Sequence, residues 1–234
     1  MNIRPIRKRP FRIYYTILLI IFFILFSKAL NASEQQVIVK KAHTTLESYL
    51  SDPDFEWFTK NMKDAKAIFI IPQFLKGAFV FGGAGGSGVV LAKNEKTGEW
   101  SHPGFYSMIS ASFGLQFGAQ ASELILMVMT QKGVLPFKNA SFKLGVEASA
   151  AIGPKGGSME GSTPYNLSAD YLSFARSKGV FLGLSVEGAV IGVKNEWNWK
   201  YYGKPVSPRD IIIKNSVENP GAVQLIDLIS KATN

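Results

Sequence analysis

Cysteine is absent from this 234-residue sequence, and histidine occurs only twice, as His43 and His102. Without cysteine the chain has no disulfide, no thiolate nucleophile and no lipoprotein acylation site. Two isolated histidines make neither a HExxH motif nor a paired metal-ligand set, and no GxSxG string occurs. We therefore expect no catalytic residues, no metal and no cofactor, and we interpret the protein as a non-enzyme.

Arginine is scarce after residue 32. Six of the 26 Lys and Arg residues lie in residues 1–32, which leaves 20 basic against 17 acidic residues, or +3, and only two of the 20 are Arg. Nucleic-acid surfaces need concentrated positive charge, so this composition argues against a nucleic-acid partner. Residues 67–159 hold seven Lys and four acids, and this positive excess permits contact with an anionic lipid surface.

The first 32 residues have the pattern of a secretion signal. Residues 1–12 carry five basic residues and no acid, and residues 13–26 form an uncharged apolar run that ends before Ser27 and Lys28. Such a run suits a signal peptide and is shorter than the roughly 18–20 apolar residues of a spanning helix. We expect cleavage after Ala32 and a periplasmic or secreted protein, with retention of residues 13–26 as a membrane anchor as the alternative.

Residues 33–234 are expected to form a single domain with helices at both ends. Ser33 and Gln36 fit a capping box, and apolar residues then recur at helical spacing, which predicts a helix over residues 34–50. Asp52 before Pro53 is typical of the start of a second, short helix that ends near residue 63. Asn219 before Pro220 predicts a final helix.

Short segments rich in Val, Ile and Phe fill the chain between these helices. We expect strands over residues 67–71, 77–82, 88–93, 105–118, 123–130, 141–152, 171–175, 180–184 and 185–193. No amphipathic helix of 10–15 residues separates successive strands, which argues against a parallel βαβ fold. The sequence therefore predicts an α+β fold, a mostly antiparallel β sandwich or barrel with helices at its N- and C-terminal ends.

Three glycine-containing strings carry a family resemblance: IPQFLKGAFVFGG at residues 71–83, FGLQFGAQ at 113–120 and KGVFLGLSVEGAVI at 178–191. In order and spacing they resemble the SYLF family, a lipid-binding domain of bacterial envelope proteins and of eukaryotic actin-patch and endosomal proteins. The resemblance implies a SYLF fold and a non-catalytic domain of the bacterial cell envelope that binds anionic phospholipid or a lipid ligand. The alternative is a structural envelope protein that acts through a protein partner.

Some eukaryotic members of that family select phosphoinositides through basic N-terminal elements. Here residues 33–66 carry five Lys and six acids, so this segment departs from that pattern. The candidate lipid contacts are lysines, three of them spaced at i, i+3 and i+6 near the end of the second helix, together with the aromatic stretch at residues 197–202, which suits a membrane interface or a packed loop. They are Lys60, Lys63, Lys66, Lys76, Lys138, Lys143, Trp197 and Trp199.

Two further motifs invite chemical interpretations. Residues 83–88 read GAGGSG, a literal GxGxxG, but the apolar residues after it favour a strand over the helix that a phosphate cradle requires. We expect a glycine-rich hairpin or bulge there. Glu123, Glu147 and Glu187 lie in apolar strand contexts, where a carboxyl group either acquires a raised pKa or simply faces solvent.

Overall fold

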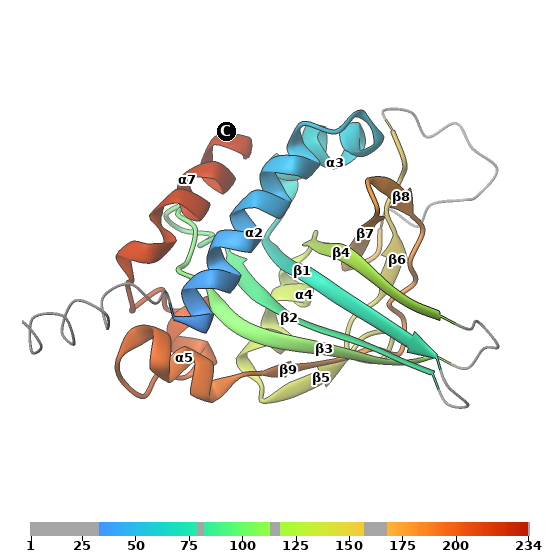
Figure 1. The fold of residues 1–234 in the computed structure, drawn as a ribbon. Helices are drawn as coiled ribbons and strands as arrows, with labels where there is room; N and C mark the ends of the chain where they lie inside the picture. The colour runs from blue at the N-terminus through green and yellow to red at the C-terminus, as the bar shows by residue number, and fades with distance from the viewer. Residues whose placement is uncertain (1–32, 79–81, 113–117, 157–167, 234) are drawn as a thin grey trace, which may run out of the picture. The chain divides into compact units, whose positions relative to one another are not determined.

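Helix α2 (Glu34–Leu50) opens the part of the chain that the computed structural model describes, namely residues 33–78, 82–112, 118–156 and 168–233 (Figure 1). Its bounds match the predicted first helix. Three short helical segments follow: η1 (Pro53–Phe55), α3 (Glu56–Asn61) and η2 (Met62–Asp64). Asp52 caps the first of them, because its carboxylate accepts the backbone N–H of Asp54. The predicted leader lies outside the described residues.

One curled, mostly antiparallel sheet forms the centre of the fold. Within the described residues nine strands pair in the order β5-β9-β3-β2-β1-β4-β7-β6, with β8 added to β7. Only the pairing of β6 with β7 is parallel among them. The strands are β1 (Ala67–Ala78), β2 (Gly82–Ala92), β3 (Gly104–Ser112), β4 (Gly118–Val128), β5 (Ser141–Lys143), β6 (Ala150–Ile152), β7 (Tyr171–Ser177), β8 (Val180–Leu182) and β9 (Val190–Val193).

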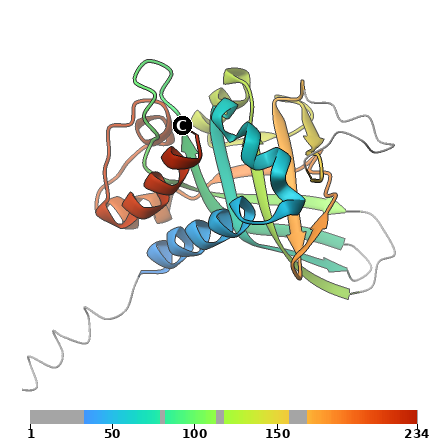
Figure 2. The ribbon, with the colours of Figure 1, turned by 90° about the horizontal axis from the view of Figure 1, so that it is seen from above.

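The remaining helices follow β4 and β9. Helix α4 (Gln131–Val134) and η3 (Leu135–Lys138) join β4 to β5. Helices α5 (Asn195–Tyr202), α6 (Pro208–Ile212), η4 (Pro220–Ala222) and α7 (Val223–Ala232) complete the chain. Figures 1 and 2 show the sheet curling into a half-barrel with α2 and α7 side by side across it. The predicted α+β, barrel-like class is therefore confirmed.

Two predicted strands and one predicted loop differ from the structure. The expected strand 141–152 is divided into β5 and β6, and only the end of 185–193 forms β9. Gly145 and Gly188 explain both interruptions, since their φ angles of +82° and +81° belong to turns and not to strands. Residues 197–202 lie in helix α5, which ends at Gly203 in the left-handed conformation.

The sheet buries a hydrophobic cluster on each face. On β1, Ile68 and Ile70 face α2, α3 and α7, whereas Phe69 and Ile71 face the other way, toward η3 and α6. This alternation is the period-two pattern of a strand that is covered on both sides. We call the first side, against which α2, α3 and α7 pack, the helical face. Both clusters lie within residues 35–234, which form one compact unit.

The GxGxxG string lies inside β2 and not in a hairpin turn; it pairs with β3 along its whole length and with β1 from Gly83 to Ser87. Strand β1 changes register between Ile70 and Gln73, around Pro72, and there its backbone passes close to Gly86 and Gly88. A Cβ on Gly88 would lie 2.0 Å from the carbonyl oxygen of Ile70, and one on Gly86 would lie 2.5 Å from that of Gln73. These glycines therefore permit a close backbone approach, and no helix follows them to bind phosphate.

Candidate functional site: the exposed end of the helical face

Exposed aliphatic side chains form a row across one end of the sheet. Leu75 on β1 is a register partner of Gly85 on β2, which in turn pairs with Ile109 on β3, and Ile109 pairs with Val190 on β9. The exposed fractions of Leu75, Ile109 and Val190 are 51%, 64% and 42%. Since register partners point to the same side of a sheet, these side chains share one face. We call this set the distal row.

The distal row belongs to the helical face. The neighbouring residues Phe74, Met108 and Ile191 are buried in the cluster on the opposite face. Figure 1 shows β1, β2 and β3 extending past α2 and α7 toward the right of the view. The row is therefore exposed because the covering helices end before it, although the strands continue.

Each end of the distal row carries a polar feature. At one end Lys143 on β5 is the register partner of Val190. At the other end Ala121 on β4 is the partner of Leu75, and its carbonyl oxygen accepts a hydrogen bond from the hydroxyl of Ser177 at 3.0 Å. The exposed Lys178 follows Ser177 in the chain. Among the described residues neither Lys143 nor Lys178 forms an ion pair.

A polar row separates the distal row from the covered part of the sheet. This row consists of Gln73 on β1, Ser87 on β2 and Ser107 on β3, which are register partners of one another. The ammonium group of Lys194 donates to the hydroxyl of Ser87 at 3.1 Å and lies 3.4 Å from the ring centre of Trp197. Trp197, one of the candidate lipid contacts, therefore lies near this end of the sheet.

A hollow of about 430 Å³ adjoins the distal row at its Ala121 end. Residues from β1, β4 and the turn between β7 and β8 line it: Pro72, Gln73, Ala121, Ser122, Glu123, Arg176, Lys178 and Gly179. Its volume lies within the roughly 300–1,000 Å³ that small-molecule sites occupy. Gln73 belongs to the polar row, and Ala121 is the register partner of Leu75 in the distal row. The hollow and the distal row therefore form one continuous surface.

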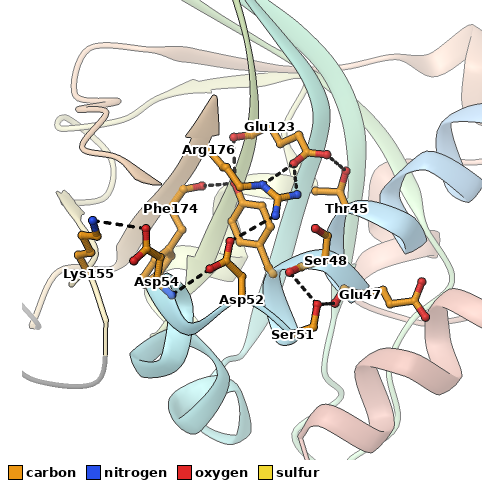
Figure 3. Close-up of polar contacts among 11 residues, drawn as sticks. Thr45, Glu47, Ser48, Ser51, Asp52, Asp54, Glu123, Lys155, Phe174 and Arg176 are labelled. Atoms are coloured by element: carbon orange, nitrogen blue, oxygen red, sulfur yellow. Dashed lines mark hydrogen bonds and ion pairs between the residues drawn. The ribbon is translucent and has the colours of Figure 1, made fainter. Parts of the chain in front are cut away.

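An ion pair forms one wall of the hollow (Figure 3). The Arg176 guanidinium donates to Oε2 of Glu123 through Nε at 2.9 Å and through Nη2 at 2.5 Å. Its Nη1 lies 3.5 Å from Oδ2 of Asp52, and the group stacks 5.1 Å from the ring centre of Tyr49. The Tyr49 hydroxyl donates to the carbonyl oxygen of Glu123 at 2.9 Å. This network ties the end of α2 to β4 and β7.

The charges of that wall compensate each other. Oε1 of Glu123 accepts the hydroxyl of Thr45 at 3.1 Å, so both carboxylate oxygens are engaged. Burial acts to lower the pKa of Arg176, but the hydrogen bonds and charge of Glu123 outweigh it and hold that pKa above its ordinary value. Burial, with a further contribution from Glu123, raises the pKa of the Tyr49 hydroxyl. Glu123, proposed from sequence as solvent-facing or acid–base, thus serves as an ion-pair partner.

The structure separates the candidate lysines into two groups. Lys60 and Lys63 lie on α3 and η2, and Lys66 directly precedes β1, whereas Lys143 lies on the distal row. The eight residue steps from Ala67 to Leu75 span about 26 Å of strand. The first group and the distal row therefore lie at opposite ends of β1.

The first lysine group is not a concentrated basic patch. Lys60 pairs with Glu56, with 2.5 Å between Nζ and Oε1. Residues 52–66 contain four acids besides their three lysines. A helix-surface pair of this kind neutralises much of the charge that an anionic leaflet would attract.

The other candidate residues lie elsewhere on the molecule. Lys76 follows Leu75, and its register partner is Ala84, which is buried on the opposite face. Lys138 is exposed at the end of η3. Trp199 is 44% exposed and donates its indole N–H to the carbonyl oxygen of Val206 at 3.1 Å.

The remaining titratable candidates have structural positions. Glu147 accepts the backbone N–H of Lys143 at 3.3 Å, and Glu187 is exposed. Nδ1 of His102 accepts the backbone N–H of Asn219 at 3.1 Å, and His43 is half-buried on α2. No group of three His, Cys, Asp or Glu side chains in the described part of the chain is arranged to hold a metal ion. Nor has any helix of that part the length and hydropathy needed to span a bilayer.

Sequence reasoning missed Leu75, Ile109 and Val190 as surface residues. All three lie in apolar strand segments, where strand patterning predicts burial. The available signal was local: Leu75 and Ile109 border strings rich in Gly, Ala and Ser, residues too small to support a covering layer. The importance of Arg176 was also missed, although it is one of only two Arg residues after residue 32.

The fold and this surface define an α+β domain with a partly uncovered sheet and no assembled metal cluster among its described residues. A family model described as "Ysc84: Las17-binding protein actin regulator" matches residues 109–232, from β3 to the end of α7. The chain belongs to this Ysc84 (SYLF) family, which confirms the family predicted from the sequence; two of the three glycine strings lie within the matched residues.

Curated relatives from yeast and human agree with this assignment. LAS seventeen-binding protein 3 of Saccharomyces cerevisiae is 34% identical over 165 residues, which cover 69% of this chain and 35% of that protein. Protein YSC84 of the same yeast is 32% identical over 177 residues, covering 74% of this chain and 37% of that protein. Human SH3 domain-containing YSC84-like protein 1 is 28% identical over 170 residues, covering 72% of this chain and 49% of that protein. The chain thus spans half or less of the length of these relatives.

Proposed function

We propose that this chain is a non-catalytic binding domain whose ligand is an anionic phospholipid surface. The observation that carries the proposal is the distal row: three exposed aliphatic side chains in line, with Lys143, which forms no ion pair within the described parts of the chain, at one end and Lys178 near the other. Apolar side chains beside cations suit the boundary between acyl chains and anionic head groups.

The magnitude of such contact favours weak, reversible binding. A Lys near an anionic leaflet contributes about 1 kcal/mol, and burial of a half-exposed aliphatic side chain contributes a similar amount. Two lysines and three such side chains therefore supply about 5 kcal/mol, which corresponds to sub-millimolar affinity. The other candidate residues (Lys60, Lys63, Lys66, Lys76, Lys138, Trp197 and Trp199) would add to this only if the bilayer reached their parts of the surface.

Vesicle co-sedimentation of residues 33–234 tests the proposal. This part contains the compact unit at residues 35–234 and excludes the apolar leader, which would bind membranes by itself. We expect binding to phosphatidylcholine vesicles that contain phosphatidylglycerol, little binding to pure phosphatidylcholine, and a decrease with added salt because screening shortens the reach of the lysines. Binding that is indifferent to both lipid charge and salt would contradict an anionic lipid ligand.

A second candidate function is recognition of a protein partner. One relative, the yeast LAS seventeen-binding protein 3, is named for binding LAS seventeen. In this case the distal row would contact a protein surface in the envelope, and vesicles of any composition would leave the protein in the supernatant.

The proposed location is the bacterial periplasm, reached through a leader that is cleaved after Ala32. The basic residues 1–12 and the apolar residues 13–26 support this proposal. Intact-mass measurement of the protein recovered from an envelope fraction distinguishes the two forms. A mass that includes residues 1–32 would instead indicate an anchored protein.

A further inference from the structure

The hollow beside the distal row has the position and charge of a head-group site. We propose that it binds the phosphate-bearing head group of one phospholipid molecule, whose acyl chains lie along the distal row. This inference rests on the proposed function and deepens it, from attraction to a charged surface to capture of a single lipid.

Continuity between a polar and an apolar surface is the first argument. Gln73 and Ala121 line the hollow, and Ala121 is the register partner of Leu75 at the start of the row. From there Gly85 adds no side chain, so a shallow path continues to Ile109. A ligand that occupies both surfaces needs a polar end and an apolar end, which is the construction of a phospholipid.

The charge of the hollow is the second argument. Of the charged groups that line the hollow, the guanidinium of Arg176 and the carboxylate of Glu123 bind and offset each other, and Asp52, which also pairs with Arg176, lies outside the lining. Lys178 is then the lining cation without an ion-pair partner among the described residues. The exposed Gln73 also lines the hollow and supplies an amide donor. An anionic group that accepts hydrogen bonds, such as a phosphate, matches this lining.

Rigidity of the wall is the third argument. Arg176 is fixed by Glu123, Asp52 and Tyr49, and its side chain is only 12% exposed. A site whose walls are already ordered loses little conformational entropy when it binds. The ion pair therefore positions the hollow, and Lys178 contacts the ligand.

Calorimetric titration of residues 33–234 with dihexanoyl phosphatidylglycerol, below its micelle concentration, tests the inference. Lys178→Glu is expected to weaken binding about tenfold, since it reverses the charge that faces the phosphate. Leu75→Ser is expected to weaken binding about fivefold, because it removes apolar contact with the acyl chains. Both side chains are exposed, so neither variant should lower the melting temperature appreciably.

Matched controls come from other parts of the surface. Val223 on α7 is 49% exposed, close to the 51% of Leu75, and Val223→Ser should leave lipid binding unchanged. Lys63→Glu, at the opposite end of β1, should also leave the titration unchanged. Dihexanoyl phosphatidylcholine tests whether net lipid charge matters, and inorganic phosphate tests whether the acyl chains matter.

The outcomes distinguish failure of the single-lipid site from failure of the proposed function. Weakening by Lys178→Glu and Leu75→Ser, but not by the controls, supports the single-lipid site. Vesicle binding without any titration by the short-chain lipid overturns the site and leaves the proposed function standing, as does equal binding by all the variants. Inorganic phosphate binding as tightly as the lipid would make the hollow a free-phosphate site and overturn the inference. Absence of both vesicle and short-chain binding overturns the proposed function itself.

Discussion

The two halves of strands β1–β4 differ in what covers them. In the half that begins at Ala67, Ile68, Phe69 and Ile70 are fully buried, and both faces lie under helices or loops. In the other half Leu75 and Ile109 expose more than half of their side chains on the helical face. The same sheet therefore provides a stable core at one end and an open apolar surface at the other.

The boundary between the halves is built by specific residues. Pro72 lies where β1 changes register, opposite the close approach of Gly86 and Gly88. On the helical face the Arg176–Glu123 pair ends the region that α2 covers. Stability and surface exposure are thus assigned to separate parts of each strand, and substitutions at the boundary test this division.

The largest expected effect is that of Gly88→Ala at the boundary. Its Cβ would lie 2.0 Å from the carbonyl oxygen of Ile70 and 2.9 Å from the Cα of Ile71, so the two strands would have to separate. We expect a loss of about 3 kcal/mol or more in the free energy of unfolding, measured by urea denaturation.

Gly83→Ala is the matched control in the same glycine string. No atom lies within 4 Å of a Cβ at this position, so its stability should change by less than about 1 kcal/mol. Equal effects at the two positions would contradict the close-approach explanation. ATP or NAD should shift the melting temperature of neither variant nor of the unaltered protein, since the string binds no phosphate.

A somewhat smaller loss is expected for Arg176→Met, which leaves Glu123 and Asp52 without their cation. Removal of one partner of a partly buried ion pair destabilises because the remaining charge stays desolvated. We expect about 2 kcal/mol by urea denaturation. The double variant Arg176→Met/Glu123→Met should recover part of that loss.

The exposed pair between Lys214 and Asp210 provides the comparison. Its atoms are 2.9 Å apart, but the side chains are 56% and 31% exposed. Lys214→Met should cost no more than about 0.5 kcal/mol. A similar cost for both pairs would mean that the Arg176 network does not stabilise the boundary.

Local signals predicted the helices and the fold class. Asp52 with Pro53 and Asn219 with Pro220 start helical segments where expected, and α2 has the predicted bounds. Patterning failed where a turn depended on one glycine, as at Gly145 and Gly188, because strand propensity does not reveal a positive φ. It also failed for α5, whose buried Asn198 and Tyr201 are separated by exposed residues that obscure its periodicity.

The candidate site was less predictable than the fold. Lys143 and Trp197 were named from composition, and the structure places them near the distal row. The row itself depends on register across four strands and on where the helices end, and neither can be obtained from a single sequence. The Arg176–Glu123 pair joins residues 53 positions apart, which no local pattern indicates.

Acidification should protonate His102 and so destabilise the helices on the covered half of the sheet. The expected loss of unfolding free energy is smaller than that for loss of the Arg176–Glu123 ion pair. Burial lowers the pKa of His102 below 6.5, against the opposing charge of Glu218. A depressed folded-state pKa means that the neutral ring is favoured, so this stability is present above about pH 6.5 and is lost as pH falls through the folded-state value.

Protonation of His102 would also break the hydrogen bond from the Asn219 N–H to its Nδ1, because a protonated ring cannot accept it. Asn219 caps η4, which leads into α7 on the covered half. His102→Asn retains a polar side chain without titration near neutral pH, so its unfolding midpoint should vary less between pH 7.5 and 5.5. Identical pH dependence in the two proteins would assign the effect to other groups.

The smallest effect on stability, and the sharpest test of the comparison, is expected for Ile109→Ser. At 64% exposure this side chain contributes little to the core, so the free energy of unfolding should change by less than about 0.5 kcal/mol. Met108→Ser, one residue away and fully buried, should instead lose several kcal/mol. If the distal row contacts lipid, Ile109→Ser should nevertheless reduce the fraction bound to phosphatidylglycerol vesicles. A large loss of stability would show that Ile109 belongs to the core, and unchanged vesicle binding would remove it from the lipid contact.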